Sequence, residues 1–260
     1  MQRTAREPVQ LAGNQATGTL KLVALLFMFA DHAGKMLFPA VPEMRILGRI
    51  AFPIYAWCMV VGFHYTRDPL RYAMRVLLVG IVSQPLYMAA LDHTWQQPNI
   101  FLTLFMALLA LMAVSEKPWE KQSTALHIGG RCLAAVGLLA CLALTDMLKC
   151  DYGWRGVLLV VLLYAVRDSS KGIAAVMVAF CLFWGANTST VARLFGLPIQ
   201  RLQGTALSLL APWLRIQALA VLALPFILPR WKERVKLPKW VGYGLYPAHL
   251  ALLWLLEQVM

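Results

Sequence analysis

The chain has 260 residues, of which 60% are hydrophobic and only 14% are charged. A soluble domain is typically about 45–50% apolar, so this composition excludes an ordinary globular surface and indicates that lipid covers the protein. The formal net charge of +12 would suggest a nucleic-acid partner in a soluble protein, but here the basic residues alternate between loops and no nucleic acid is expected.

Apolar stretches recur along the chain, and each is long enough, or nearly long enough, to cross a bilayer as a helix of about 20 residues. They cover residues 20–39, 46–63, 72–91, 100–114, 128–148, 154–166, 172–186, 205–228 and 240–257. We therefore predict an all-α, polytopic transmembrane helix bundle of about nine spans. Residues 1–19 are expected to form a cytoplasmic tail, and residues 20–260 a single membrane domain.

The positions of lysine and arginine predict the orientation in the membrane. Most of the 24 lysines and arginines lie near the N-terminus and around residues 67–75, 117–131, 167–171 and 230–239, whereas residues 92–99 contain none. Basic loops are cytoplasmic as a rule. We expect a multi-pass protein of the bacterial inner membrane, with its N-terminus in the cytoplasm and its C-terminus in the periplasm.

Ionisable residues interrupt the first apolar stretch past its midpoint. A charge at the centre of a span costs about 2.5–3.5 kcal/mol on insertion scales, so such residues are functional candidates. Asp31 and Lys35 share a helix face and are expected to neutralise each other, which leaves the imidazole of His32 free. A structural network that ties helices together is the alternative.

The second stretch begins with Arg45 and Arg49, four residues apart on one face. A guanidinium group suits phosphate or carboxylate, although anchoring at the membrane interface is the alternative for both residues. Pro53 is predicted to kink this helix near its middle.

Three candidates lie in loops on the predicted outer side. Asn99 begins the fourth stretch, and Asp151 and Tyr152 precede the sixth. A polar residue at a helix start is often only a cap, and that alternative stays open for Asn99.

The last stretch places Tyr246 and His249 three residues apart, on one helix face. An imidazole titrates near pH 6.5, so it exchanges a proton at neutral pH. The topology places His32 and His249 near mid-membrane and the other candidates in the outer half. We expect a cavity open to the periplasm with the two imidazoles at its floor. Two histidines without a third ligand do not indicate a metal site.

Several segments, taken in order, carry a family resemblance. They read LKLVALLFMFADHAGKMLF at 20–38, GRIAFPIYA at 48–56, SQPLYM at 83–88, PNIFLTLF at 98–105, DYGWRGVLL at 151–159 and YPAHLALLWL at 246–255. The chain resembles the TraX family of conjugative pilin acetylases, which is similar in outline to the wider group of membrane acyltransferases.

The resemblance implies acetyl transfer from acetyl-CoA to the N-terminal amine of a pilin subunit. Asp31 and His32 match the DH motif, Arg49 the GR motif, and Tyr246 and His249 the late motif. His32 is expected to act as general base with Asp31 orienting it, and Tyr246 as an oxyanion donor, while the choice between His32 and His249 as the base stays open. The expected binding residues are Arg49, Lys35, Asn99, Asp151 and Tyr152.

Acetyl-CoA would then be a co-substrate whose thioester arm enters between helices. The basic segment 230–239 is a candidate for holding the CoA phosphates, although topology alone also explains its charge. Two other classes remain: a transporter or flippase, which would more often show a repeat between its halves, and a non-enzymatic pilus assembly factor with purely structural polar contacts between helices.

Overall fold

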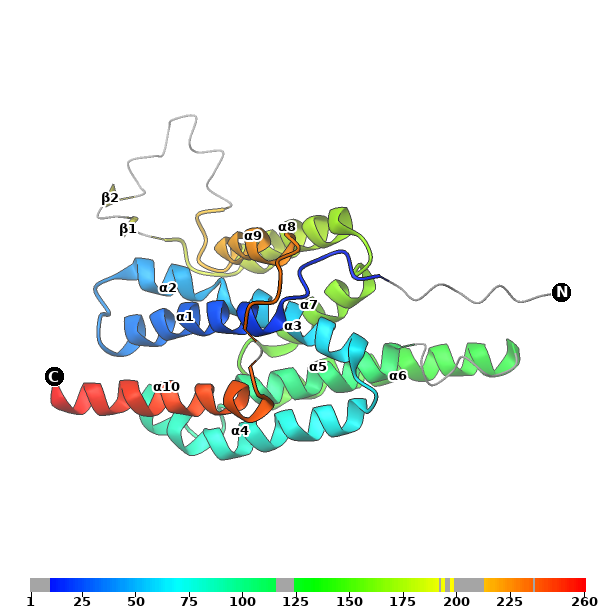
Figure 1. The fold of residues 1–260 in the computed structure, drawn as a ribbon, viewed down its shortest axis with the longest axis horizontal. Helices are drawn as coiled ribbons and strands as arrows, with labels where there is room; N and C mark the ends of the chain where they lie inside the picture. Colours follow the sequence, from blue (N-terminus) through cyan, green and yellow to red (C-terminus); the bar gives the residue numbers. More distant parts are fainter. Residues whose placement is uncertain (1–9, 116–123, 192, 195–196, 199–212, 236) are drawn as a thin grey trace.

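The structure is a computed structural model that describes residues 10–115, 124–191, 193–194, 197–198, 213–235 and 237–260. Over these ranges it is an elongated helical bundle (Figure 1), which confirms the all-α class. The predicted features at residues 1–9, 116–123 and 205–212 lie outside the described residues.

The elements follow the predicted stretches with a few exceptions. They are α1 (Thr17–Met36), α2 (Pro42–Gly48), α3 (Ala51–Tyr65), α4 (Pro69–Leu91), α5 (Ile100–Val114), α6 (Thr124–Met147), α7 (Gly153–Ala165), α8 (Ser170–Ala186), β1 (Arg193–Leu194), β2 (Leu197–Pro198), the 3-10 helix η3 (Ala218–Ala223), α9 (Leu224–Ile227) and α10 (Lys239–Val259). β1 and β2 form one antiparallel pair.

Successive helices run back and forth along the long axis of the bundle (Figure 1). We call the end that holds residues 10–16 the N-terminal end, and the end that holds Met260 the C-terminal end. At the N-terminal end, Ala12 N donates to Arg167 O at 2.8 Å. At the C-terminal end, Asp151 N donates to Pro98 O at 3.4 Å. Successive loops therefore lie at opposite ends of the bundle, and loops that are far apart in the sequence come into contact at each end.

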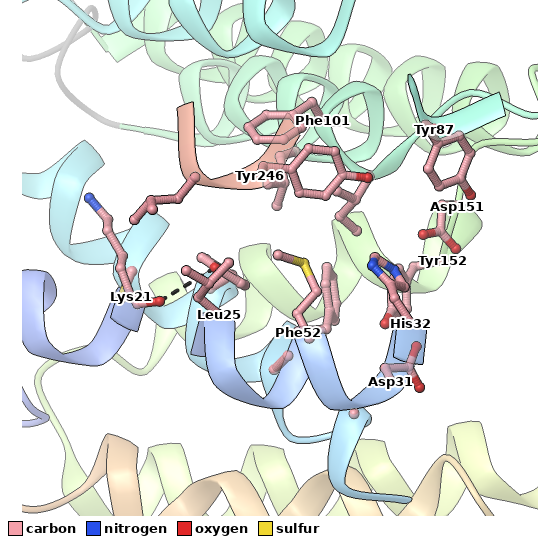
Figure 2. Close-up of a pocket in the computed structure, with 18 of the residues that line it drawn as sticks. Lys21, Leu25, Asp31, His32, Phe52, Tyr87, Phe101, Asp151, Tyr152 and Tyr246 are labelled. Atoms are coloured by element: carbon pink, nitrogen blue, oxygen red, sulfur yellow. Dashed lines mark hydrogen bonds between the residues drawn. The ribbon is translucent and has the colours of Figure 1, made fainter. Parts of the chain in front are cut away.

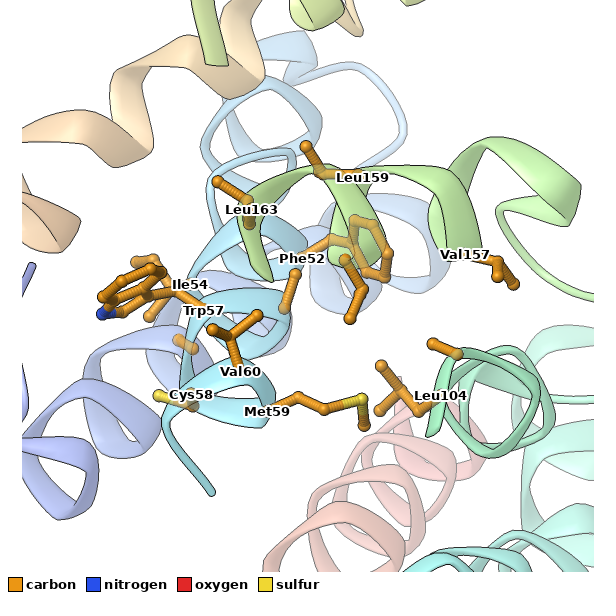
Figure 3. Packing of buried hydrophobic residues seen from close by; sticks show 14 of the residues in the cluster. Phe52, Ile54, Trp57, Cys58, Met59, Val60, Leu104, Val157, Leu159 and Leu163 are labelled. Carbon is orange, nitrogen blue, oxygen red and sulfur yellow. The ribbon is translucent and has the colours of Figure 1, made fainter. Parts of the chain in front are cut away.

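Helix α3 occupies the centre of the bundle. It is apolar on all sides, as a helix surrounded by other helices must be, and Trp57 and Phe63 are fully buried. Figure 3 shows its side chains packed against Leu104 of α5 and Leu159 of α7. The indole N–H of Trp57 donates to Asn14 O at 2.6 Å, which satisfies the one polar atom of that side chain.

The second stretch is broken at Arg49 and Ile50, one turn before Pro53, so the kink predicted from this proline lies near the start of the stretch and not at its middle. Arg49 N donates to Ile46 O, and Ile50 N donates to Leu47 O, each at 3.1 Å in a tight three-residue turn. A proline ring clashes with the carbonyl four residues earlier but is tolerated in the first turn of a helix. Pro53 therefore sits in the first turn of α3, and the chain bends just before it.

Of the predicted helix over 205–228, the described part is helical over 218–227 and extended at 214–216. Ile216 N donates to Ser189 O at 3.1 Å, and Val191 N donates to Leu214 O at 2.8 Å. This extended pairing takes up the groups that a helix would use, so helical structure begins only at η3 and ends with α9.

Part of the segment predicted as a tail is buried in the structure. Leu11 and Asn14 have no exposed surface, and the side-chain amide of Asn14 donates to Phe226 O at 2.9 Å. Residues 11–16 are therefore packed within the bundle.

Three helical segments among the described residues are long and apolar enough to cross a membrane: Pro42–Tyr65, Pro69–Leu91 and Gly129–Met147. Shorter apolar helices occur at Ile100–Val114, Gly153–Ala165, Ser170–Ala186 and Ala218–Ile227. The length and apolar composition of these helices indicate a membrane protein.

Candidate functional site

A cavity of about 400 Å³ lies between α1, α3, α4, α5 and α10. Figure 2 shows side chains from these helices facing one another across it. Of the residues predicted from the sequence, those that line the cavity are Asp31, His32, Lys35, Arg49, Asp151, Tyr152 and Tyr246.

The two predicted histidines are in direct contact. His32 Nδ1 lies 2.8 Å from His249 Nε2, and the two rings are nearly parallel, with an interplanar angle of 8°. His32 lines the cavity, while His249 is buried behind it with 6% of its surface exposed.

The contacts of His249 determine where the protons lie. Its Nδ1 is 3.2 Å from Leu245 O, and a carbonyl oxygen only accepts, so Nδ1 carries the hydrogen. In the neutral ring Nε2 is then an acceptor, and it takes the hydrogen that His32 carries on Nδ1. His32 is left with an unprotonated Nε2, which is the atom that a general base requires.

The predicted pairing of Asp31 with Lys35 is not what the structure contains. Arg49 Nη2 donates to both carboxylate oxygens of Asp31, at 2.7 and 2.8 Å, and Arg45 Nη1 lies 3.0 Å from Oδ2. A guanidinium binds a carboxylate through several aligned N–H groups, which an ammonium cannot match. Asp31 therefore orients two arginines, and the partner of His32 is His249.

Close packing between α1 and α2 makes this ion pair possible. A Cβ atom at Gly48 would lie 2.2–2.4 Å from side-chain atoms of Asp31. Only glycine leaves room for the carboxylate here, immediately before Arg49. Arg49 Nε is buried and has no hydrogen-bond partner within the described part of the chain.

Lys35 lies at the C-terminal end of the cavity. Its ammonium group donates to Leu91 O at 3.0 Å and lies 3.0 Å from His93 Nε2. The ring of His93 stacks on Tyr87, with centroids 4.9 Å apart. Sequence reasoning gave His93 no role and passed over Tyr87, because only the packing of α4 against α1 brings them to Lys35.

Asp151 and Tyr152 reach the cavity through a bend before α7. Tyr152 has a φ of 64°, which is uncommon outside glycine, and its ring stacks on Phe52 with centroids 4.2 Å apart. The hydroxyl of Thr103 donates to Asp151 O and holds the bend in place. Burial raises the pKa of the Asp151 carboxyl, while the charge of Arg49 acts in the opposite direction.

Asn99 is a helix cap. Its Oδ1 accepts from Phe101 N at 3.0 Å, and its amide donates to Gly80 O and Gln84 Oε1 at 2.8 and 2.9 Å. The side-chain oxygen and both hydrogens of the side-chain amide are bonded within the protein, so we leave Asn99 out of the proposed site.

Tyr246 is buried on α10, one helical turn before His249. Its ring packs edge-on against Phe101 and His249, with centroid distances of 4.8 and 5.3 Å. Figure 2 shows its hydroxyl directed into the cavity, across from His32. Phe101, which sequence reasoning did not single out, fixes this ring.

The site has the parts of a proton-transfer centre. Across the described residues, no group of three or more His, Cys, Asp or Glu side chains is placed to hold a metal ion. The arrangement offers a bare imidazole nitrogen, a phenol and a carboxylate around one space.

The family comparison covers nearly the whole chain. The TraX family, described as TraX protein, matches residues 16–257. The chain belongs to the TraX family. Both histidines, the Asp31–Arg49 pair and Tyr246 lie inside the matched range. The helices that line the cavity also lie inside it, except for the last two residues of α10.

Two curated relatives of this TraX-family chain are informative. The probable fimbrial assembly protein FimC, serogroup H1, of Dichelobacter nodosus is 33% identical over 108 residues, which cover 36% of this chain and 44% of the relative. An uncharacterized protein of Rickettsia prowazekii (strain Madrid E) is 24% identical over 176 residues, which cover 68% of this chain and 64% of the relative. The chain thus spans less than two thirds of the length of either relative. No solved structure matches it.

Proposed function

We propose that this TraX-family protein is an inner-membrane acetyltransferase that moves the acetyl group of acetyl-CoA to the N-terminal α-amine of a pilin subunit. The observation that carries the proposal is the contact of His32 with His249, which leaves a basic imidazole nitrogen on a cavity wall. The family match and the fimbrial relative support the pilus context.

The chemistry requires one base and balances without a cofactor. A free α-amine has a pKa of about 7.7–8.0, so a large share of it is protonated near neutral pH and must first release a proton to water. The neutral amine attacks the thioester carbonyl while His32 Nε2 removes the proton that the new C–N bond makes acidic. The tetrahedral intermediate then collapses, the C–S bond breaks, and His32 returns the proton to the leaving thiolate. The products are the N-acetylated chain and free CoA.

His249 and Tyr246 have distinct roles in this scheme. His249 is a positioning residue, because it accepts the Nδ1 hydrogen of His32 and so fixes the tautomer and the ring orientation. The phenol of Tyr246 is the donor for the oxyanion. One such donor is worth about 10²–10³ in rate where it has been measured.

Arg49 and Asp31 form the rigid frame of the site. The carboxylate aligns the guanidinium, whose unused Nε–H is a second donor for developing negative charge. Lys35, Asp151 and Tyr152 lie on the acceptor side of the cavity.

The proposed orientation has the N-terminal end of the bundle in the cytoplasm. The loop that holds Arg67 and the loop that holds Arg167 both lie at that end, as expected for cytoplasmic loops. We propose a multi-pass topology of about nine spans with a periplasmic C-terminus.

The test uses the purified protein in nanodiscs with acetyl-CoA and a peptide that carries a pilin N-terminus. We expect release of free thiol together with a gain of one acetyl group at the peptide's α-amine by mass spectrometry. A peptide with a blocked amine is the control. Peptide binding without thiol release in the wild-type protein would rule out the enzyme and favour an assembly factor.

A further inference from the structure

The cavity reaches further along α1 than the chemistry at His32 needs. Lys21 and Lys35 both line it, and they are separated by about 21 Å at 1.5 Å of rise per helical residue. Figure 2 shows Lys21 and Leu25 at one side of the cavity and His32 with Asp151 at the other. The imidazole is therefore part of the wall of a passage and does not form its floor, which corrects the expectation from the sequence.

The middle of the passage is apolar and buried. Met59 of α3 and Leu104 of α5 are among its buried lining residues, and Leu25 and Met28 line it from α1. Lining residues with exposed surface occur at each end, namely Pro238 at one and Lys35 at the other. An elongated space with apolar side chains along its middle suits a long, flexible, neutral chain.

The two ends carry different chemistry. Lys21 and Tyr72 of α4 line the passage towards the N-terminal end. Arg75 lies one turn after Tyr72 on the same face of α4, exposed and beside the lining residues. The acidic neighbour, Glu233, has its carboxylate bound to Gly18 N and Thr19 N at 3.0 and 3.1 Å. Cationic groups at this end are thus available to an anion.

At the C-terminal end of the passage, the cationic groups are already bound within the protein, and a carboxylate is available. The guanidinium groups of Arg45 and Arg49 are bound to Asp31, and Lys35 is bound to Leu91 O. Asp151 keeps a carboxylate beside the cavity, and Figure 2 shows it next to His32 with the hydroxyl of Tyr87 directed at it. A carboxylate beside a general base is where an ammonium group would dock before it loses its proton.

We propose that the two substrates enter this passage from opposite ends, so that the acetyl group is transferred across the membrane. The inference rests on the proposed acetyltransferase function. The acyl donor is an anionic phosphate ester with a long thioester arm: its phosphates stay at Lys21 and Arg75, and its arm runs past Leu25 and Met28 to His32. The acceptor amine arrives from the C-terminal end and is bound by Asp151.

Two charge variants separate the ends. Lys21→Glu is expected to raise the KM for acetyl-CoA by about tenfold or more, the scale of one charge-assisted hydrogen bond, with little change in kcat or in the KM for the peptide. Arg71→Glu is the matched control, because Arg71 lies on α4 with 85% of its side chain exposed and pairs with Asp68. Asp151→Asn is expected to raise the KM for the amine and leave that for acetyl-CoA unchanged. A Lys21→Glu effect on the peptide alone would overturn the assignment of the ends.

A second experiment tests transfer across the bilayer itself. The protein is reconstituted in one orientation into liposomes, with acetyl-CoA on the N-terminal side and the acceptor peptide on the other, since neither crosses a bilayer. We expect acetylated peptide in this arrangement and none when both substrates are on either single side. Leu25→Trp, which narrows the passage about two helical turns away from His32, should abolish the product while Leu26→Trp on the exposed face should not.

The two proposals fail differently. Wild-type protein in detergent that releases no thiol with both substrates present fails as an acetyltransferase. Protein that is active in detergent but acetylates in liposomes only when both substrates share one side keeps the proposed function and overturns the passage.

Discussion

At the residue scale, the contact between His32 and His249 joins helices from the two ends of the chain at 2.8 Å. The sequence indicated both residues, because a polar imidazole inside a membrane span costs free energy and the flanking motifs resemble those of the TraX family. It could not rank them, since the carbonyl of Leu245 that fixes the tautomer is visible only in three dimensions. The same limit explains the wrong partner for Asp31: helical spacing brings Lys35 to its face, but packing brings Arg49 closer.

Substituting the two histidines separates the base from its support. His32→Ala is expected to lower kcat about 10²–10⁴-fold, the usual cost of losing a general base. His249→Ala is expected to lower kcat less and to change the pH profile, because His32 loses the acceptor on its Nδ1. A structural hydrogen bond between membrane helices is worth only about 0.6 kcal/mol on average, so melting temperatures should change little.

The measurement is acetyl-CoA turnover per folded molecule across pH, with His64→Ala as the control because His64 does not line the cavity. If His32→Ala keeps more than about a tenth of the wild-type rate, His32 is not the base.

Arg49→Lys tests the frame of the site. Lysine keeps the charge but loses the planar guanidinium, whose Nη2 donates to both oxygens of Asp31. We expect kcat to fall by about tenfold or more, on the scale of one charge-assisted hydrogen bond. Arg71→Lys, at an exposed ion pair, should have wild-type turnover. Wild-type kinetics for Arg49→Lys in a folded protein would mean that Arg49 only anchors the helix.

At the scale of elements, most helices were predictable because a hydrophobic run in a membrane protein leaves few alternatives to a helix. The boundaries of α4 and α5 agree closely with the apolar stretches. The failures have local causes. The bend before Pro53 falls earlier than the middle of the stretch, because the proline ring acts on the carbonyl four residues before it. The pairing of residues 214–216 with 189–191 replaced part of a predicted helix.

Gly48 lets α2 pack closely enough against α1 for Asp31 to reach Arg49, and Gly48→Ala tests this contact. The new methyl group would lie within 2.4 Å of the Asp31 carboxylate, so α1 and α2 must separate at a cost of about 1–3 kcal/mol. We expect a lower melting temperature and weaker turnover together. Gly244→Ala is the matched control, since a Cβ there meets nothing within 4 Å. Equal behaviour of the two variants would show that the α1–α2 contact is not as tight as described.

At the scale of the whole molecule, the alternation of loops between the two ends predicts the topology. A reporter that is active only in the cytoplasm should be inactive at Met260 and active in the loop between Val166 and Ser169. A reporter that needs the periplasm should give the reverse pattern. Cytoplasmic activity at Met260 would mean that the number of spans is even. The sequence predicted this orientation from lysine and arginine alone, but not the passage, which depends on how five helices leave space between them.

The ion pair between Asp31 and Arg49 also constrains how the protein is made. Each charge alone inside the lipid would cost several kcal/mol, and Arg49 follows Asp31 by 18 residues, so α1 emerges from the ribosome before its partner does. The two helices that carry the pair are adjacent in the chain and packed together. We therefore expect the insertion machinery to release them into the lipid as one hairpin, with α1 waiting at the translocon until α3 arrives. Nascent chains stalled so that α1 has emerged from the ribosome but Arg49 has not should be extractable from the membrane. Chains stalled after α3 has emerged should resist extraction, and Asp31→Ala should remove that difference.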